Sequence, residues 1–227
     1  MNNSANGIGD KRLWVKAYDW VKESIFSGKL EEGLPLSENM LAQEVKMSRT
    51  PIREALRKLA QDGFVMLVPG KGAIVSATSI DDVREIYEIR RLLEPYAART
   101  AVYRIPDGFI DEIEEKWEDT VSKLRDGCEI NLSDVAALDM SFHSSLIRYT
   151  ANGRLRDAML PYNAQIERFQ LLSAKSLSNL METTKQHLNL IECIRKRDGD
   201  ELACQLLKHI ISSEENVMRL YLPGRAN

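Results

Sequence analysis

The residues of this chain that are best suited to bind a metal ion are one aspartate and its three histidines. Asp139 and His143 are four residues apart, so on a helix their side chains project from the same face, one turn apart. His187 lies about 12 residues before, and His209 about 10 residues after, the turn sequence Asp198-Gly199-Asp200. An antiparallel pair of helices joined there would bring the two imidazoles level. We therefore expect all four side chains to meet at one ion.

One carboxylate and three imidazoles form a donor set for Zn²⁺ above all, with Ni, Mn and Fe as alternatives, and an octahedral ion would keep open positions. A single histidine is more often an ordinary core or surface residue, so the prediction depends on both spacings together. Three roles for the ion remain open: it holds a sensed ligand, it activates water for hydrolysis, or it only closes the fold. No separate general base is apparent near the four residues, and we expect that the protein is not an enzyme.

These residues belong to a long helical region, residues 78–227, that we expect to form one domain. Thr78 or Ser79 caps its first helix, and apolar residues then recur at helical spacing as far as Leu222. The pattern predicts about six helices, because turn residues interrupt it near 106–108, 126–127, 151–153, 176–178 and 198–200. Pro95 and Pro161 are expected to kink their helices.

The first third of the chain has a different pattern and predicts a second domain. Residues 1–10 have the composition of a disordered tail, and residues 11–77 are expected to fold separately. The pattern predicts helices over 13–26, 38–45 and 48–62, a turn over 31–36, and strands over 64–68 and 73–75. The fold class is therefore mainly α: three helices with a β-wing, followed by an all-helical domain.

Basic residues gather where the third of these helices begins, just after Ser48. Arg49, Thr50 and Arg53 would lie on the exposed face of its first turns, and Arg57 continues that face. A guanidinium can pair with a guanine edge or a phosphate, and the free amides of a helix N-terminus attract phosphate oxygens. The pattern favours DNA reading in the major groove, although a solvated Arg-rich face is the alternative.

The turn between the two expected strands supports the DNA interpretation. Lys71 lies between Gly70 and Gly72, which let a backbone approach a phosphate or a minor groove closely. The whole chain has a net charge of −3, yet Lys and Arg outnumber Asp and Glu by 11 to 9 over residues 1–78 and are outnumbered by 25 to 20 over residues 79–227. Overall charge therefore neither requires nor excludes nucleic acid.

A set of short motifs runs through residues 12–76. They are Leu36-Ser37-Glu38, Leu41-Ala42, Ser48-Arg49-Thr50-Pro51-Ile52-Arg53-Glu54-Ala55-Leu56, Leu59, Asp62-Gly63 and Pro69-Gly70-Lys71-Gly72. Together they closely resemble the winged helix of the GntR family of bacterial transcription regulators. The resemblance implies that Arg49 and Arg53 read bases and phosphates, that Ser48 and Thr50 contact phosphates, and that Gly70 and Lys71 form the wing contact. Asn39 departs from the family pattern, since some members have a basic residue there.

A second set of motifs covers residues 80–222. It comprises Ile89-Arg90, Leu93-Glu94, Asp139-Met140-Ser141-Phe142-His143, Asn152-Gly153, His187, Gly199-Asp200, Ala203 and His209. It resembles the FCD ligand-binding domain of the FadR-like branch of that family. The resemblance implies an antiparallel helical bundle that binds a small organic acid, commonly with its carboxylate on the metal. Gln186 stands where many members have Glu.

Arg90 is the candidate for a second anchor of that carboxylate, because a guanidinium pairs bidentately with it. An ion pair between Arg90 and an acidic neighbour is the alternative. The two resemblances together imply a homodimer that binds a palindromic site on double-stranded DNA, most often as a repressor relieved by its ligand.

The remaining features of the sequence set the expected surroundings of the protein. The chain start has no apolar segment of a signal peptide, and no apolar run is long enough to span a membrane. We therefore expect a cytoplasmic protein. Cys128, Cys193 and Cys204 have no metal-ligand spacing, and they are expected to be buried reduced thiols.

Overall fold

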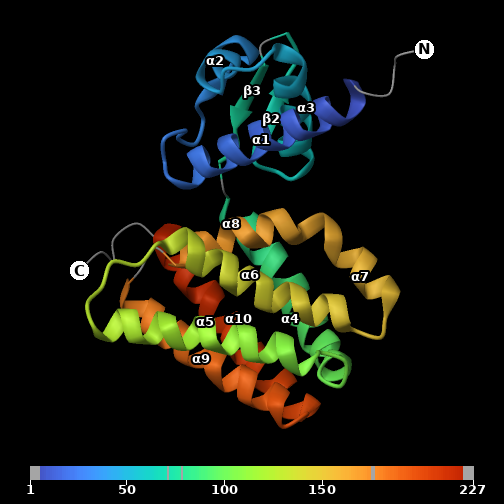
Figure 1. Ribbon diagram of the computed structural model, residues 1–227, viewed down its shortest axis with the longest axis vertical. Helices are drawn as coiled ribbons and strands as arrows, with labels where there is room; N and C mark the ends of the chain where they lie inside the picture. Colours follow the sequence, from blue (N-terminus) through green and yellow to red (C-terminus); the bar gives the residue numbers. More distant parts are fainter. Residues whose placement is uncertain (1–5, 71, 78, 175–176, 222–227) are drawn as a thin grey trace. The chain divides into compact units, whose positions relative to one another are not determined.

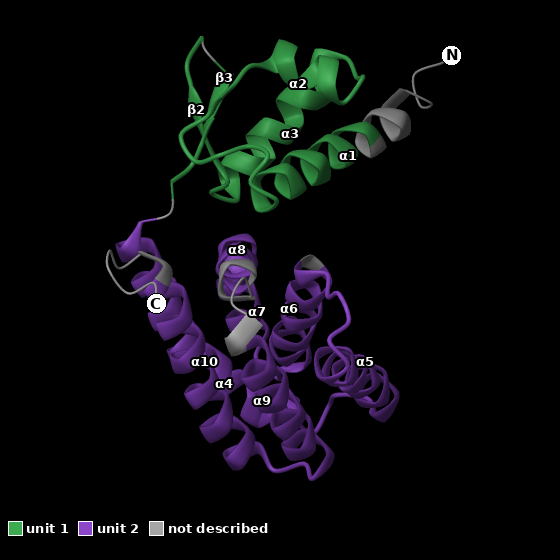
Figure 2. Cartoon of the chain, turned by 90° about the vertical axis from the view of Figure 1, so that its left-hand side faces the viewer, with its two compact units in different colours: residues 1–78 green, residues 79–227 purple. Residues whose placement is uncertain are grey.

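The computed structural model describes residues 6–70, 72–77, 79–174 and 177–221. The chain divides into two compact units, Met1–Thr78 and Ser79–Asn227 (Figure 2). The predicted fold class is confirmed, since helices dominate both units and the described strands form one small sheet in the first unit.

The first unit consists of three helices and a three-stranded antiparallel sheet. The helices are α1 (Asn6–Phe26), α2 (Glu38–Glu44) and α3 (Arg49–Gln61), and the strands are β1 (Pro35–Leu36), β2 (Val65–Val68) and β3 (Gly72–Val75). The strand order is β1-β3-β2, so that Leu36 pairs with Ala73, and Val68 pairs with Gly72. β1 lies in the stretch for which the sequence predicts only a turn.

The ends of these elements differ from the sequence prediction in two places. α1 begins at Asn6, within the expected tail, where Gly7 and Gly9 lower helix propensity by about 1 kcal/mol each relative to Ala. Ser48 occupies the N-cap position of α3, but its side chain makes no capping hydrogen bond. The side of α3 that faces the core carries an apolar stripe of Ile52, Ala55, Leu56 and Leu59, all of them buried, and Pro51 in the first turn is buried as well.

The second unit is entirely helical in its described residues (Figure 1). Its helices are α4 (Ile80–Ala101), α5 (Asp107–Arg125), α6 (Leu132–Tyr149), α7 (Gly153–Met159), α8 (Asn163–Ala174), α9 (Leu177–Arg195) and α10 (Gly199–Tyr221). Four of the breaks agree with those expected from the sequence, whereas the break expected over 176–178 overlaps residues 175–176, which lie outside the described residues, and the start of α9. A 3-10 turn, Leu160–Tyr162, also separates α7 from α8, so that the described residues form seven helices where about six are expected. Pro161 lies in that turn, where the sequence predicts only a kink.

α4 is the helix around which the second unit is organised. Ser79 and Asp82 form a reciprocal capping box at its start, with hydrogen bonds of 2.9 and 3.1 Å. α4 packs most extensively against α10 and also contacts α6 and α8. The close approach to α10 requires Gly199, because a Cβ atom there would lie 2.8 Å from the Arg99 carbonyl oxygen.

The structure bears on two further expectations from the sequence: that no segment spans a membrane, and that the three cysteines are buried. No helix of the described residues is long and apolar enough to cross a membrane. The expectation of buried thiols is wrong for two of the three cysteines: Cys193 is buried, whereas Cys128 and Cys204 are exposed. Cys128 follows the turn at Gly127, and Cys204 lies on the outer face of α10, so neither position reaches the core.

Candidate metal centre and nucleic-acid interface

The four expected metal ligands lie together inside the second unit. Asp139 and His143 come from α6, His187 from α9 and His209 from α10, and each of the four residues is more than nine-tenths buried. One ligand atom from each residue lies within 4.8 Å of the corresponding atoms of the other three. The helix spacing and the α9–α10 hairpin therefore bring the side chains together as the sequence analysis expects.

The distances within this group suit a shared cation. The Oδ1 atom of Asp139 is 2.9 Å from His187 Nε2, 3.8 Å from His143 Nε2 and 4.0 Å from His209 Nε2. The Nε2 atoms of His143 and His209 are 3.2 Å apart. His187 Nε2, although close to Asp139, has no directed hydrogen bond to any described residue. Four electron-pair donors at these distances repel one another unless a cation or protons lie among them.

The other nitrogen of each imidazole is already engaged. His143 Nδ1 donates to Glu94 Oε2 at 2.6 Å, His187 Nδ1 to the Thr183 carbonyl at 2.9 Å, and His209 Nδ1 to Gln186 Oε1 at 2.9 Å. These three partners are acceptors, and the contact of His143 Nδ1 with Glu94 is much shorter than its 3.4 Å contact with the donor Arg90 Nη2. The proton of a neutral imidazole therefore lies on Nδ1 and leaves Nε2 free to bind a metal. The residues thus fit a divalent ion of the first transition row.

Electrostatics favours the protonation states that a metal needs. Burial lowers the pKa of His209 well below its usual value, and the neighbouring imidazoles of His187 and His143 add to this effect. Burial acts in the opposite sense on Asp139, but the attraction of His143 and His187 outweighs it and lowers the pKa of the carboxyl. A neutral imidazole and an ionised carboxylate are the forms that coordinate metals.

A buried ion pair supports His143 from behind. Arg90 Nε donates to Glu94 Oε1 at 2.7 Å, and both side chains are 1% exposed. Burial raises the pKa of Glu94, but the charges of Arg90 and His143 outweigh it and lower that pKa to about 2. The sequence does not predict this contact of Glu94, because the distance along the chain from Glu94 to each histidine gives no indication of which one it will meet.

Arg90, the expected anchor of an effector, takes part in the ion pair that the sequence left open as the alternative. Its charge is balanced by Glu94, and its pKa is raised because the attraction of that carboxylate outweighs burial. One nitrogen, Nη1, has no hydrogen-bond partner among the described residues. This N–H is the part of Arg90 that remains available to a ligand.

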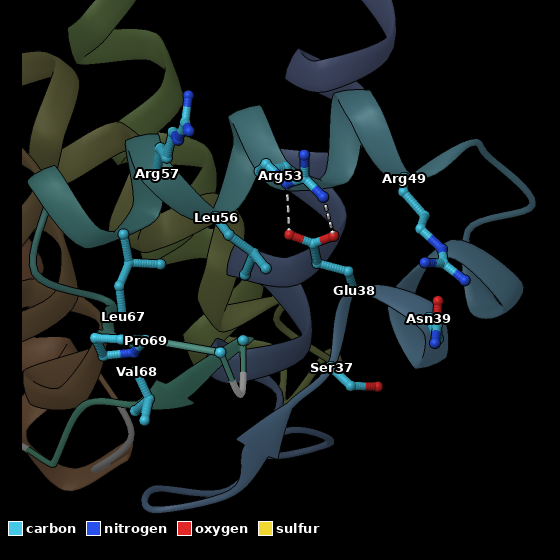
Figure 3. A pocket seen from close by; sticks show the side chains of 12 residues that line it. Ser37, Glu38, Asn39, Arg49, Arg53, Leu56, Arg57, Leu67, Val68 and Pro69 are labelled. Carbon is cyan, nitrogen blue, oxygen red and sulfur yellow. Dashed lines mark hydrogen bonds and ion pairs between the residues drawn. The ribbon is translucent and has the colours of Figure 1, made fainter.

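Four of the seven expected DNA-reading residues line a groove of about 570 Å³ in the first unit (Figure 3). Arg49, Arg53 and Arg57 from α3 line it, together with Asn39 at the start of α2 and Gly70 of the wing. Ser48 and Thr50 are exposed at the beginning of α3 but do not line the groove. Gly70 has a φ of +72°, a conformation that favours glycine. Lys71 lies outside the described residues.

Glu38 is a charged residue of this groove that the sequence analysis did not single out. Its carboxylate accepts two hydrogen bonds from Arg53, at 2.7 Å from Nε and 2.8 Å from Nη2. The hydrogen bond from Arg53 lowers the pKa of Glu38, and the charges of Arg49 and Arg57 act in the same direction. Two of the five N–H donors of Arg53 are thus used by Glu38, which fixes the plane of the guanidinium.

Comparison with family models matches both units. A model described as "FCD domain" matches residues 85–212, more than half of the chain, and one described as "Bacterial regulatory proteins, gntR family" matches residues 14–75. The second match contains the α3 groove, and the first contains all four residues of the Asp/His group.

Three similar proteins are named as transcriptional regulators, and the similarity covers most of the length of each. The HTH-type transcriptional regulator YdhC of Bacillus subtilis, described as uncharacterized, is 25% identical over 94% of this chain and 95% of its own. The HTH-type transcriptional repressor RspR of Escherichia coli K12 is 27% identical, over 89% and 88%. The gluconate operon transcriptional repressor of Bacillus licheniformis is 27% identical, over 87% and 82%.

A solved structure shares the fold. E. coli McbR/YncC superposes with a TM-score of 0.76 at 20% identity, over 92% of this chain and 99% of that one. At 20% identity this similarity supports the fold of the chain and says nothing about which ligand it binds.

Proposed function

Because the chain belongs to the GntR family of bacterial regulatory proteins and carries an FCD domain, we propose that it is a homodimeric repressor that binds a palindromic operator and senses a small organic acid at a metal ion. Regulators of this family bind DNA and are not enzymes. The observation that carries the proposal is the Asp139, His143, His187 and His209 group, in which every imidazole presents Nε2 to one centre. It occurs in the same chain as the exposed arginine face of α3. Two relatives that are named as repressors support the direction of regulation.

The DNA-binding part of the proposal assigns base and phosphate contacts to Arg49 and Arg53. Arg57, Ser48 and Thr50 add phosphate contacts from α3, and Gly70 with Lys71 adds the contact of the wing. Arg53 is the most informative residue, because Glu38 already holds its guanidinium in one plane, as bidentate pairing with a guanine requires. Three of its N–H donors are not used by Glu38.

We expect Arg53→Ala to weaken operator binding by about fivefold to 150-fold, since a bidentate base contact is worth about 1–3 kcal/mol. Gel-shift titration at fixed salt measures the effect, and circular dichroism checks that helicity is retained. Arg84→Ala, which removes an exposed arginine of α4, is the matched control and should bind as the wild type does. Glu38→Ala separates the two roles of Arg53: if Arg53 only neutralises Glu38, Arg53→Ala costs no affinity when it is added to Glu38→Ala, and the reading role is wrong.

The sensing part of the proposal assigns the ion to the Asp/His group, with zinc as the resident metal and Ni, Mn or Fe as alternatives. An ion with open coordination positions would bind the carboxylate of an effector as a Lewis acid. Arg90 would contact the same carboxylate through Nη1, the N–H of its guanidinium that has no described partner. Glu94, Thr183 and Gln186 orient the three imidazoles for this purpose.

We expect protein purified without a His tag to contain about one metal ion per chain and His187→Ala to lose it, because a missing ligand sharply weakens a divalent site. Elemental analysis measures the content, and Asn189→Ala on the exposed side of α9 is the control. Equal metal content in His187→Ala and wild type would refute the ligand role. Chelation should lower the melting temperature, and a carboxylate should raise it only in metal-loaded protein. If chelation acts but no carboxylate does, the ion is structural and the sensing role is wrong.

A further inference from the structure

The buried polar side-chain atoms without a hydrogen-bond partner, among the described residues, all lie in the second unit. They belong to Arg90, Trp117, Gln170 and His187. Native structures pair nearly all such atoms, so each one calls for a water, an ion or a ligand. The proposed ion accounts for His187 Nε2, whereas Gln170 and Trp117 lie outside the metal ligands and need another partner.

Gln170 and Trp117 line a single cavity with two of the metal ligands. Gln170, on α8, is 4% exposed, and neither its Nε2 nor its Oε1 has a partner. Trp117, on α5, stacks its ring on His187 with centroids 4.1 Å apart, but its Nε1 has no partner. Asp139 and His209 line the same cavity. An unpaired amide and an unpaired indole N–H therefore share the cavity with the proposed ion.

The cavity is small. The volume open to the centres of water molecules is about 20 Å³, and one water needs roughly 10–15 Å³ on this measure. A ligand whose carboxylate binds at the ion can therefore extend into this space by only one or two heavy atoms unless the helices repack.

The cavity is also neutral apart from the metal ligands. Of the described residues that line it, only Asp139 and His209 are ionisable in the ordinary pH range, and Thr183 and Ser213 supply hydroxyls. Arg90, the nearest cation to the imidazoles, does not line the cavity and is paired with Glu94. A second carboxylate in this space would be buried without a counter-charge, which is strongly unfavourable.

We infer that the effector is a short hydroxy monocarboxylate of the size of glycolate, and that Gln170 is the residue that recognises its hydroxyl. A hydroxyl both donates and accepts, so it can donate to Gln170 Oε1 and accept from Trp117 Nε1. Carboxylates without a hydroxyl leave both atoms unpaired, dicarboxylates bury an extra charge, and sugar acids exceed the space. This inference rests on the proposed metal site and adds to it the class of ligand.

The test measures binding to metal-loaded, full-length protein by calorimetry, with acid pairs that differ only in the hydroxyl. Glycolate should bind about tenfold more tightly than acetate, the gain expected for one hydrogen bond to otherwise unpaired groups, and lactate, with one more carbon, should bind more weakly than glycolate. Malonate and gluconate should bind more weakly than glycolate. Wild-type protein that prefers malonate or gluconate would overturn the inference.

Gln170→Leu is the decisive variant. It should reduce the ratio between hydroxy and plain acids to about one, retain the metal, and raise the melting temperature of the ligand-free protein, because it removes two unpaired buried polar atoms. Gln165→Leu makes the same change on α8 at a residue that does not line the cavity, and it should leave the ratio unchanged. A lower melting temperature with an unchanged ratio would mean that Gln170 is structural and bonded to water.

Trp117→Phe keeps an aromatic ring against His187 but removes Nε1. This variant tests the inference independently if Gln170→Leu does not fold. It should weaken the binding of hydroxy acids but not that of plain acids, and equal weakening of both would contradict the inference. The two levels of proposal remain distinguishable. If all small carboxylates bind alike, the recognition of a hydroxyl is wrong but metal-based sensing stands. If none binds, sensing itself fails and this inference with it.

Discussion

At the scale of single residues, the three imidazoles differ in what holds them in place. His143 donates to the ionised carboxylate of Glu94, whereas His187 and His209 donate to neutral acceptors, a backbone carbonyl and the amide of Gln186. A carboxylate behind an imidazole makes Nε2 a stronger electron donor than an amide does. Gln186, an amide and not a carboxylate, therefore keeps His209 oriented but leaves only His143 with an anionic partner among these three contacts.

We expect Arg90→Ala to be strongly destabilising, because it leaves the Glu94 carboxylate buried without its guanidinium partner. Breaking a buried ion pair in this way costs about 3–5 kcal/mol. Urea denaturation of the metal-loaded protein measures the change. Arg84→Ala removes the exposed partner of Asp81 and should change the free energy of unfolding little. A similarly small effect of both substitutions would mean that Arg90 contributes nothing as a partner of Glu94.

At the scale of elements, the contact between α4 and α10 is limited by one glycine. Gly199 begins α10, is buried, and faces the backbone of Arg99. Gly108 lies in the first turn of α5, where an added Cβ atom would meet nothing within 4 Å. The two glycines thus occupy comparable helix starts with opposite surroundings.

Gly199→Ala should destabilise the protein by about 1–3 kcal/mol, because α10 must move away from α4 to make room for the methyl group. Gly108→Ala should be neutral or stabilising by up to about 1 kcal/mol, since it only lowers the entropy of the unfolded chain. Thermal unfolding compares the two variants. Equal effects would show that the close approach at Gly199 does not limit the packing.

Elements that depend on local sequence are the ones that sequence analysis predicts well. Ser37 and Ser79 cap the helices that follow them, the turn expected at 151–153 separates α6 from α7, and Asp139 and His143 share a face through spacing alone. β1 was missed because two residues have no pattern of their own and pair with β3, far along the chain. Exposure of Cys204 likewise depends on which face of α10 meets its neighbours.

The unpredicted parts of the site depend on how separate helices pack. Glu94, Trp117 and Gln170 come from α4, α5 and α8, and no spacing within one helix indicates that they approach the Asp/His group. The partner of Arg90 could not be predicted for the same reason. The sequence leaves open whether Arg90 pairs with the carboxylate of a ligand or with an acidic neighbour, and only the packing of the helices identifies Glu94.

At the scale of the whole molecule, we expect the outer face of α4 and α10 to form the homodimer interface. Leu92 and Tyr96 are 67% and 53% exposed and lie one turn apart on α4, and Leu207 and Ile211 are similarly spaced and partly exposed on α10. Ion pairs from Arg91 to Glu214 and from Arg99 to Asp200 place the two apolar pairs at the same level. We expect a second copy of this chain to cover this apolar face, because the proposed palindromic operator has two equivalent half-sites.

Leu92→Glu should therefore convert the dimer to a monomer of 25.8 kDa, because it places a charge in the apolar contact. Light scattering after size-exclusion chromatography measures the mass. Tyr103→Glu changes an equally exposed side chain beyond the end of α4 and should leave the dimer intact. If Leu92→Glu remains dimeric, the interface lies elsewhere on the chain.

α4 also has a mechanical consequence for how a regulator of this kind can work. Its N-cap, Ser79, is the first residue of the second unit, and the helix extends past Glu94, the residue that supports His143. At 1.5 Å per residue these positions are about 22 Å apart, so a tilt of roughly 5° at one end moves the other by about 2 Å. Pro95 weakens the helix directly beside Glu94. A shift of Glu94 caused by a ligand at the ion would thus be carried along one continuous helix to Ser79, the residue that directly follows the first unit.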